Sequence, residues 1–140
     1  MFVGRRYVIP ILAGMALVSC SGNKTLSRDG LRSALLEGIS LASETELFID
    51  QLQQGRTTQA FAEGHLAYLE QEAWRSANEL RQARTAGRMI AVENGRIQLN
   101  SLATMLADLK NKVGDKQGLS ARRQQAAKVR TILEHAKDEI

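Results

Sequence analysis

The chain has little of the chemistry that marks a catalytic or metal-binding protein. Its 140 residues include one cysteine, one proline and two histidines, and aromatic residues make up only 4%. A single cysteine excludes an intrachain disulfide and a cysteine-based zinc site. Because the only proline is Pro10, no later segment is barred from helix by proline, and the scarcity of β-favouring residues makes helix the default expectation.

Recognisable catalytic motifs are also missing. His65 and His135 are not spaced as metal ligands, and no Gly-x-Ser-x-Gly elbow, phosphate-binding loop or dinucleotide fingerprint occurs. Glu70 and Glu72 lie two residues apart, so their carboxylates diverge on a helix. We therefore expect a protein that is not an enzyme and that needs neither a metal nor another cofactor.

The N-terminus differs from the rest of a chain whose overall composition, 44% apolar and 24% charged, is ordinary for one globular domain. Arg5 and Arg6 precede an unbroken apolar stretch from Tyr7 to Val18. A transmembrane helix needs about 20 apolar residues, so this stretch is too short to span a bilayer. A positive start followed by a short apolar run is typical of a secretion signal.

The residues Leu17-Val18-Ser19-Cys20 resemble the lipobox of bacterial lipoproteins, in which a lipoprotein signal peptidase cuts just before the cysteine. All four positions match. The resemblance covers about the first 21 residues, and it implies a diacylglyceryl thioether on Cys20 and an acylated amino group. Two or more acyl chains anchor stably, since each buried CH₂ contributes about 0.8 kcal/mol. The alternative is that Cys20 is a buried apolar thiol beside an ordinary cleavage site.

This resemblance also implies a location and a division of the chain. In lipoproteins of double-membraned bacteria, Asp after the cysteine usually signals inner-membrane retention, and this chain has Ser21 there. The cell envelope is expected, with the outer membrane facing the periplasm favoured where the source has one. The expected parts are a signal peptide over 1–19, a lipidated polar tether over 20–28 and one domain over 29–140.

Apolar and small residues recur through the domain at alternating three- and four-residue steps, the spacing of amphipathic helices. They predict a first helix that ends at Gly55, and a last helix that Ser120 caps after a break at Gly114–Gly118. The predicted core positions are Leu31, Leu35, Gly38, Ala42, Thr45, Ile49 and Leu52; Ala62, Leu66, Leu69, Ala73, Ser76, Leu80, Ala83 and Gly87; Val92, Gly95, Leu99, Leu102, Leu106, Leu109 and Val113; and Leu119, Ala126, Val129, Leu133, Ala136 and Ile140.

The expected fold class is all-α, an antiparallel bundle of about four amphipathic helices with short connections. The second and third helical segments differ in the phase of their apolar positions, and the shift beside Gly87 predicts a turn there. The alternative is one continuous helix from about 58 to 113 with a stutter near residue 88. The sequence leaves both arrangements open.

Charge is divided between the two halves of the domain. Residues 29–79 hold nine acidic and three basic side chains, whereas residues 80–137 hold twelve basic and four acidic ones. Four cations recur every seven residues beside the apolar positions of the last helix, and we call them the basic stripe: Lys116, Arg123, Arg130 and Lys137. Two acidic pairs flank the second helix in the same manner: Glu63 with Glu70, and Glu72 with Glu79.

The charged stripes have two interpretations. They face each other or water and set helix pairing, as charges do in coiled coils, with exposed pairs contributing about 0.2–1 kcal/mol each. Alternatively, the basic stripe docks an acidic protein partner or anionic lipid headgroups beside the anchor. Trp74 is a second candidate for partner binding, because tryptophan is enriched at interfaces, although partial burial at the edge of the core would also explain it. Nucleic acid is disfavoured by export and by the lack of an aromatic platform among the cations.

The remaining aromatic residues have the same two interpretations as Trp74, and burial in the core is favoured over a role as interface anchors. Phe48 lies next to Ile49, and Phe61 and Tyr68 are seven residues apart, a spacing that places both on one face of a helix. His65 lies on the acidic flank of the second helix, where it either responds to pH or is simply exposed or hydrogen-bonded.

These patterns favour a membrane-anchored envelope lipoprotein whose helical domain is a binding or adaptor module for another envelope protein. By fold-level analogy alone, pilotins are small helical lipoproteins that hold a peptide helix of a secretin in a groove. Two other functions stay open. One is a coiled-coil homo-oligomer that spaces or stiffens the envelope, and the other is a bundle that binds a small molecule or lipid in an apolar groove.

Overall fold

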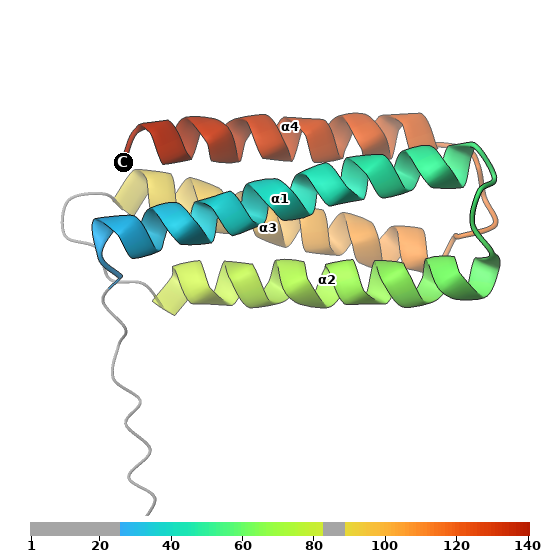
Figure 1. The fold of residues 1–140 in the computed structure, drawn as a ribbon, viewed down its shortest axis with the longest axis horizontal. Helices are drawn as coiled ribbons and strands as arrows, with labels where there is room; N and C mark the ends of the chain where they lie inside the picture. The colour runs from blue at the N-terminus through green and yellow to red at the C-terminus, as the bar shows by residue number, and fades with distance from the viewer. Residues whose placement is uncertain (1–25, 83–88) are drawn as a thin grey trace, which may run out of the picture.

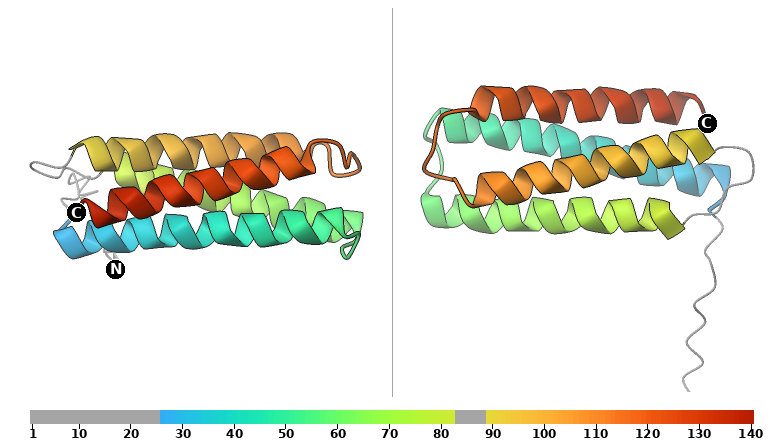
Figure 2. Two further views of the ribbon diagram at one scale, coloured as in Figure 1. Left: turned by 90° about the horizontal axis from the view of Figure 1, so that it is seen from above. Right: turned by 180° about the vertical axis from the view of Figure 1, so that it is seen from behind.

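The computed structural model describes residues 26–82 and 89–140, and these parts of the chain form a helical bundle without strands. The helices are α1 (Arg28–Gln53), α2 (Gln59–Gln82), α3 (Met89–Lys110) and α4 (Leu119–Asp138). Consecutive helices run antiparallel, and each lies beside two others around a shared core (Figures 1 and 2). The predicted all-α antiparallel bundle is therefore confirmed.

The helices α2 and α3 are separate and lie side by side. They pack against each other more extensively than any other pair, followed by α1 with α4 (Figure 2). One continuous helix from 58 to 113 is therefore wrong, because such a helix could not pack along its own length. The predicted turn at Gly87 and the core position Ala83 lie outside the described residues, as do the signal peptide and Cys20.

The folded domain begins slightly earlier than the sequence pattern indicated. The side-chain oxygen of Ser27 accepts a hydrogen bond of 3.1 Å from the backbone N–H of Gly30, so Ser27 is the N-cap of α1. The side chain of Leu26 packs, partly buried, against the core. Residues 26–28 thus belong to the helical domain rather than to the tether, because capping and apolar contact both extend upstream of Asp29.

The end of α1 follows the prediction. Gly55 has φ +65°, the left-handed conformation that glycine adopts without strain. The backbone N–H groups of Gly55 and Arg56 donate to the carbonyl oxygens of Leu52 and Gln51, at 3.2 and 3.0 Å. This pair of bonds is a Schellman motif, which satisfies carbonyl groups that the last helical turn leaves open.

The connection between α3 and α4 differs from the prediction in two details. Gly118, with φ +77°, is the N-cap of α4, so the predicted cap at Ser120 is wrong. The cap lies two residues earlier than predicted, so Leu119 is the first residue of α4 and is buried. In addition, α3 ends at Lys110, and Val113 lies beyond it, although its side chain still packs against the core.

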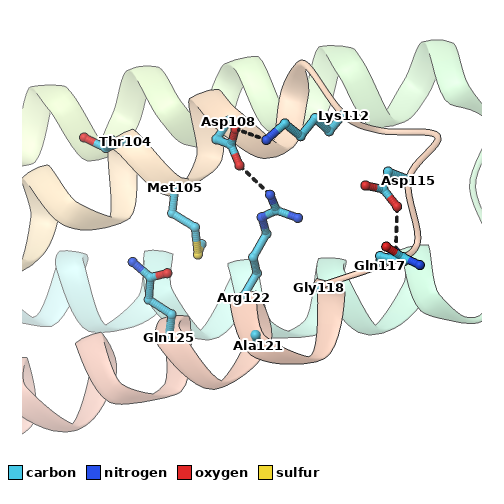
Figure 3. A pocket seen from close by; sticks show the side chains of 10 residues that line it. All are labelled: Thr104, Met105, Asp108, Lys112, Asp115, Gln117, Gly118, Ala121, Arg122 and Gln125. Carbon is cyan, nitrogen blue, oxygen red and sulfur yellow. Dashed lines mark hydrogen bonds and ion pairs between the residues drawn. The ribbon is translucent and has the colours of Figure 1, made fainter.

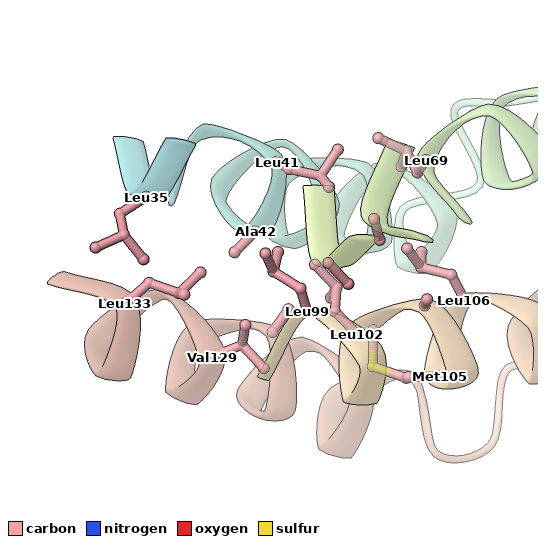
Figure 4. Packing of buried hydrophobic residues seen from close by; sticks show 14 of the residues in the cluster. Leu35, Leu41, Ala42, Leu69, Leu99, Leu102, Met105, Leu106, Val129 and Leu133 are labelled. Carbon is pink, nitrogen blue, oxygen red and sulfur yellow. The ribbon is translucent and has the colours of Figure 1, made fainter. Parts of the chain in front are cut away.

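The core is built from the predicted face of each helix. Within the described residues every predicted core position is buried except Val113, which is half-buried. Figure 4 shows leucine and valine side chains from different helices interleaving in this layer. The three- and four-residue spacing succeeds because it keeps one stripe of each helix facing the bundle axis.

Gly95 of α3 lies at a tightly packed point of the bundle. A Cβ atom added there would lie 2.9 Å from Cδ2 of Leu35 and 3.1 Å from Cδ1 of Leu80, with Leu133 next at 3.6 Å. These leucines come from α1, α2 and α4. Because Gly95 has no Cβ atom, side chains from the three other helices can pack against α3 at this point. Gly38 of α1 is similarly enclosed by Leu99 and Leu133.

We predict that Gly95→Ala lowers stability relative to Gly64→Ala by at least about 1 kcal/mol. Both changes remove a helical glycine, which alone stabilises by roughly 0.5–1 kcal/mol. Gly64 has no atom within 4 Å of the added Cβ, whereas Gly95 is enclosed by buried leucines, and overpacking costs about 1–3 kcal/mol. Urea unfolding of both variants measures the difference, and equal stabilisation by both would refute the close approach at Gly95.

A second prediction concerns Ser76, a core position of α2. Its side chain is 3% exposed, and its hydroxyl has no hydrogen-bond partner among the residues that the structure describes. An unsatisfied buried hydroxyl costs on the order of 1–3 kcal/mol. We expect Ser76→Ala to raise the unfolding free energy by more than Ser33→Ala, an exposed α1 position that gains only helix propensity. Thermal or urea unfolding with the opposite ranking would contradict this.

Candidate functional site

Three side chains of α2 form an exposed line that we call the aromatic row: Phe61, His65 and Tyr68. Their spacing of four and three residues places them on one flank of the helix. The rings of Phe61 and His65 stack with centroids 5.7 Å apart and an interplanar angle of 7°, and the Tyr68 ring lies 6.0 Å from that of His65. Phe61 is 58% exposed and Tyr68 52%. The expectation that both belong to the core is therefore wrong.

Side chains of α1 pack against the aromatic row. Phe48 is buried as predicted, and its ring centroid lies 4.4 Å from that of His65 and 6.2 Å from that of Phe61. On the same flank of α1, Oε1 of Glu44 lies 3.2 Å from Nε2 of His65, an ion pair when the imidazole is protonated. The side chain of His65 is thus partly buried, with a carboxylate beside it.

Local structure explains why the row begins where it does. After the turn at Gly55, the hydroxyl of Thr58 accepts a hydrogen bond of 3.3 Å from the backbone N–H of Phe61. Thr58 thereby satisfies one free N–H group of the first turn of α2. The chain reversal and this cap bring Phe61 level with Phe48 at the end of the bundle that is distant from the start of α1 (Figure 1).

Farther along the same α1–α2 face lies a carboxylate cluster: Glu37, Glu72 and Glu79 around Arg75. The guanidinium of Arg75 binds Glu72 at 2.5 Å and Glu79 at 3.1 Å within α2, and it also bonds Glu37 of α1. The hydrogen bonds that Arg75 donates to Glu72 and Glu37 raise the pKa of Arg75 above its ordinary value. One cation therefore serves three carboxylates, and the cluster keeps a net negative charge.

The basic stripe occupies another face, where most of it is paired. Nε of Arg130 lies 2.7 Å from Oε1 of Glu46, and Nη1 of Arg123 lies 3.6 Å from Oδ1 of Asp50, both on α1. The hydrogen bond that Arg130 donates to Glu46 raises the pKa of Arg130. The remaining two members are Lys137, which lies 3.3 Å from Asp138, and Lys116, which lies in the α3–α4 connection near Gly55.

The stripe therefore supports the interpretation that charges set helix pairing, because Arg123 and Arg130 join α4 to α1. The acidic pairs on α2 face elsewhere: Glu70 binds Lys110 of α3 at 2.5 Å, and Glu72 and Glu79 bind Arg75. Trp74 is 43% exposed, in agreement with its expected place at the edge of the core.

A second candidate site is a shallow cleft of about 570 Å³ between the end of α3 and the start of α4 (Figure 3). Met105 forms its apolar floor, and the charged groups at its rim neutralise one another. Asp108 accepts hydrogen bonds from Arg122 and, at 2.8 Å, from Lys112. Because these cations are already engaged by a carboxylate, the cleft offers a ligand fewer free contacts than the aromatic row does.

The described parts of the chain contain no group of three or more His, Cys, Asp or Glu side chains placed to hold a metal ion. Within residues 26–82 and 89–140, no helix combines the length and hydropathy that a membrane-spanning helix needs. We compared the chain with protein-family models, with curated proteins and with solved structures, and none of the three comparisons gave a match.

We predict that Asp108 stabilises the bundle near neutral pH and that this contribution is lost in acid. The hydrogen bond from Lys112, followed by that from Arg122, lowers the pKa of the Asp108 carboxyl in the folded chain. Its contribution to stability is therefore complete above the unfolded pKa of about 3.9 and is lost as pH falls through the lower folded pKa. Asp108→Asn should be less stable than the unmodified chain at pH 7, and the two should converge in strong acid.

Urea midpoints measured across that pH range test this prediction. Glu63→Gln is the control, since the exposed Glu63 carboxylate accepts a hydrogen bond from the uncharged side chain of Gln59 at 2.9 Å. A constant difference between Asp108→Asn and the unmodified chain at every pH would show that Asp108 stabilises the bundle without its charge.

Proposed function

We propose that the chain is a membrane-anchored envelope lipoprotein whose helical bundle is a binding module for another envelope protein. The lipobox resemblance around Cys20 supports the anchor, and the exposed aromatic row carries the binding role. Phe61 and Tyr68 sit outside a core that is already filled by aliphatic side chains (Figure 4). Aromatic side chains contribute more than most others to protein interfaces, so the row, where three rings lie together, is the contact surface that we propose.

The geometry of the bundle suits such a role. The tether joins the domain at the start of α1, whereas the aromatic row follows the turn after the end of α1 (Figure 1). A helix of 26 residues is about 39 Å long, at 1.5 Å per residue. A protein anchored through Cys20 would therefore present the row at the end of the bundle distant from its tether, where a partner in the envelope can reach it.

The α3–α4 cleft keeps a second function open, the binding of a small molecule. Its volume of about 570 Å³ is within the range of small-molecule sites, and Met105 gives it an apolar floor. We place it second because Asp108, Lys112 and Arg122 already neutralise one another, so that few of its charged groups are free to bind a ligand selectively.

Two measurements on one set of cells test the proposal. The intact mass of the membrane-extracted protein should correspond to a chain that begins at Cys20 and carries lipid, and Cys20→Ala should abolish this form. In the same membranes, photo-crosslinking from p-benzoylphenylalanine in place of Phe61 should give a discrete adduct with an envelope protein. The same crosslinker in place of Ile97, which is 46% exposed on α3, is the matched control.

Each part of the proposal can fail separately. An unmodified mass would remove the anchor, and the domain would then be a freely diffusing protein. Adducts that are equally abundant from positions 61 and 97, or absent from both, would remove the aromatic row as the contact surface.

A further inference from the structure

We infer that the partner segment that docks on the α1–α2 face is a cationic amphipathic helix. This inference rests on the proposed function and specifies the chemistry of the partner. The face combines two surfaces that a single helix can cover: the aromatic row near the Gly55 turn, and the carboxylate cluster beyond it. The contacts Phe48–His65, Glu44–His65 and Glu37–Arg75 show that these surfaces follow one another along the same pair of helices.

The length of the face matches a helix of moderate size. From Phe61 to Glu79 the face extends along most of α2, roughly 27 Å at a rise of 1.5 Å per residue. A partner helix of about 18 residues would cover this distance. Its apolar side chains would lie against Phe61 and Tyr68, and the other half of the same helix would face the carboxylate cluster.

The net charge of the α1–α2 face determines which charge the partner helix must carry. Among the residues that the structure describes, the α1–α2 face carries four carboxylates, Glu37, Glu44, Glu72 and Glu79, and one guanidinium, that of Arg75. An anionic or uncharged helix would bring these carboxylates out of water without new partners, and burying an unpaired charge is costly. Lysine or arginine side chains would pair with them, and cations also bind favourably over aromatic rings such as those of the row.

Within residues 26–82 and 89–140, the cations that α3 and α4 place beside α1 and α2 bind other carboxylates. Arg123 and Arg130 of α4 approach α1 from its opposite flank, where they bind Asp50 and Glu46. Lys110 is engaged with Glu70 between α2 and α3. The carboxylates of the α1–α2 face therefore keep a net negative charge within the described bundle, and a cationic partner is the ligand that would neutralise it.

The test uses the full chain carrying Cys20→Ala and two fluorescein-labelled peptides of 18 residues. On the helical side that would face the bundle, the first peptide has leucine in the half opposite the aromatic row and lysine in the half opposite the carboxylate cluster, and the second has glutamate in place of lysine. Fluorescence anisotropy should show tighter binding of the lysine peptide. Phe61→Ala combined with Tyr68→Ala should weaken it at least about tenfold, as expected for two aromatic interface residues. Glu72→Gln with Glu79→Gln should weaken it less and reduce its dependence on salt.

The control for specificity is Ile97→Ala, which removes an exposed apolar side chain from α3 and should leave binding unchanged. Circular dichroism establishes that each variant is folded. Equal affinity for the two peptides, or equal loss with Ile97→Ala, would overturn the inference. So would a dimer that forms through Phe61 and Tyr68, seen by sedimentation, because a second copy would then be the occupant.

This outcome is separable from the proposed function. An adduct from position 61 in cells, together with no preference for the lysine peptide, would keep the binding module and reject the cationic helix. A preference for the lysine peptide with no adduct in cells would keep the affinity of the face for a cationic helix and reject the binding module in the envelope.

Discussion

Close approach of the helices at Gly95 and Gly38 sets the geometry on which the rest of the bundle depends. Leu35, Leu80 and Leu133 converge on Gly95 from three other helices. Protein interiors are packed nearly as densely as organic crystals, so a side chain at this point would force the helices apart. The tight core also has a consequence for the surface. Once aliphatic side chains fill the interior, the larger aromatic rings of α2 are left on the outside.

Ion pairs then fix which helix neighbours which. Cations of α4 bind carboxylates of α1, Lys110 of α3 binds Glu70 of α2, and Arg122 of α4 binds Asp108 of α3. Each exposed pair contributes little free energy, but a wrong neighbour would bring like charges together. The division of the sequence into an acidic and a basic half is thus explained mainly by helix pairing. The α1–α2 face is the exception, because its carboxylates outnumber its cations.

The sequence predicted the fold better than the site. Helical periodicity identified the core because burial repeats with the turn of the helix, and Gly55 marked a helix end because only glycine suits its backbone. Ser120 failed as a cap because Gly118 starts α4 by its left-handed conformation instead. Phe61 and Tyr68 were assigned to the core because hydrophobicity alone cannot say which side of a seam a residue faces. Their true flank was visible in the spacing, since both lie one position before core residues Ala62 and Leu69.

The pairing of the basic stripe was likewise only half predictable. A repeat of seven residues shows that four cations share a flank of the last helix, but not which helix lies beside that flank. That depends on the order of the helices around the core, which is a property of the folded chain. The candidate contact surface is therefore the row of aromatic residues and not the basic stripe of Lys116, Arg123, Arg130 and Lys137. The lipobox resemblance at Cys20 stays a prediction from the sequence.

The most direct test of the central claim is the accessibility of the aromatic row in the intact envelope. Cys20 is the only cysteine, so Phe61→Cys or Ile97→Cys adds a single free thiol once Cys20 carries lipid. If the row is an interface, maleimide should label position 61 slowly in cells and rapidly in the purified protein, while position 97 is labelled rapidly in both. Equally rapid labelling of position 61 in cells would show that nothing covers the row and would contradict the account.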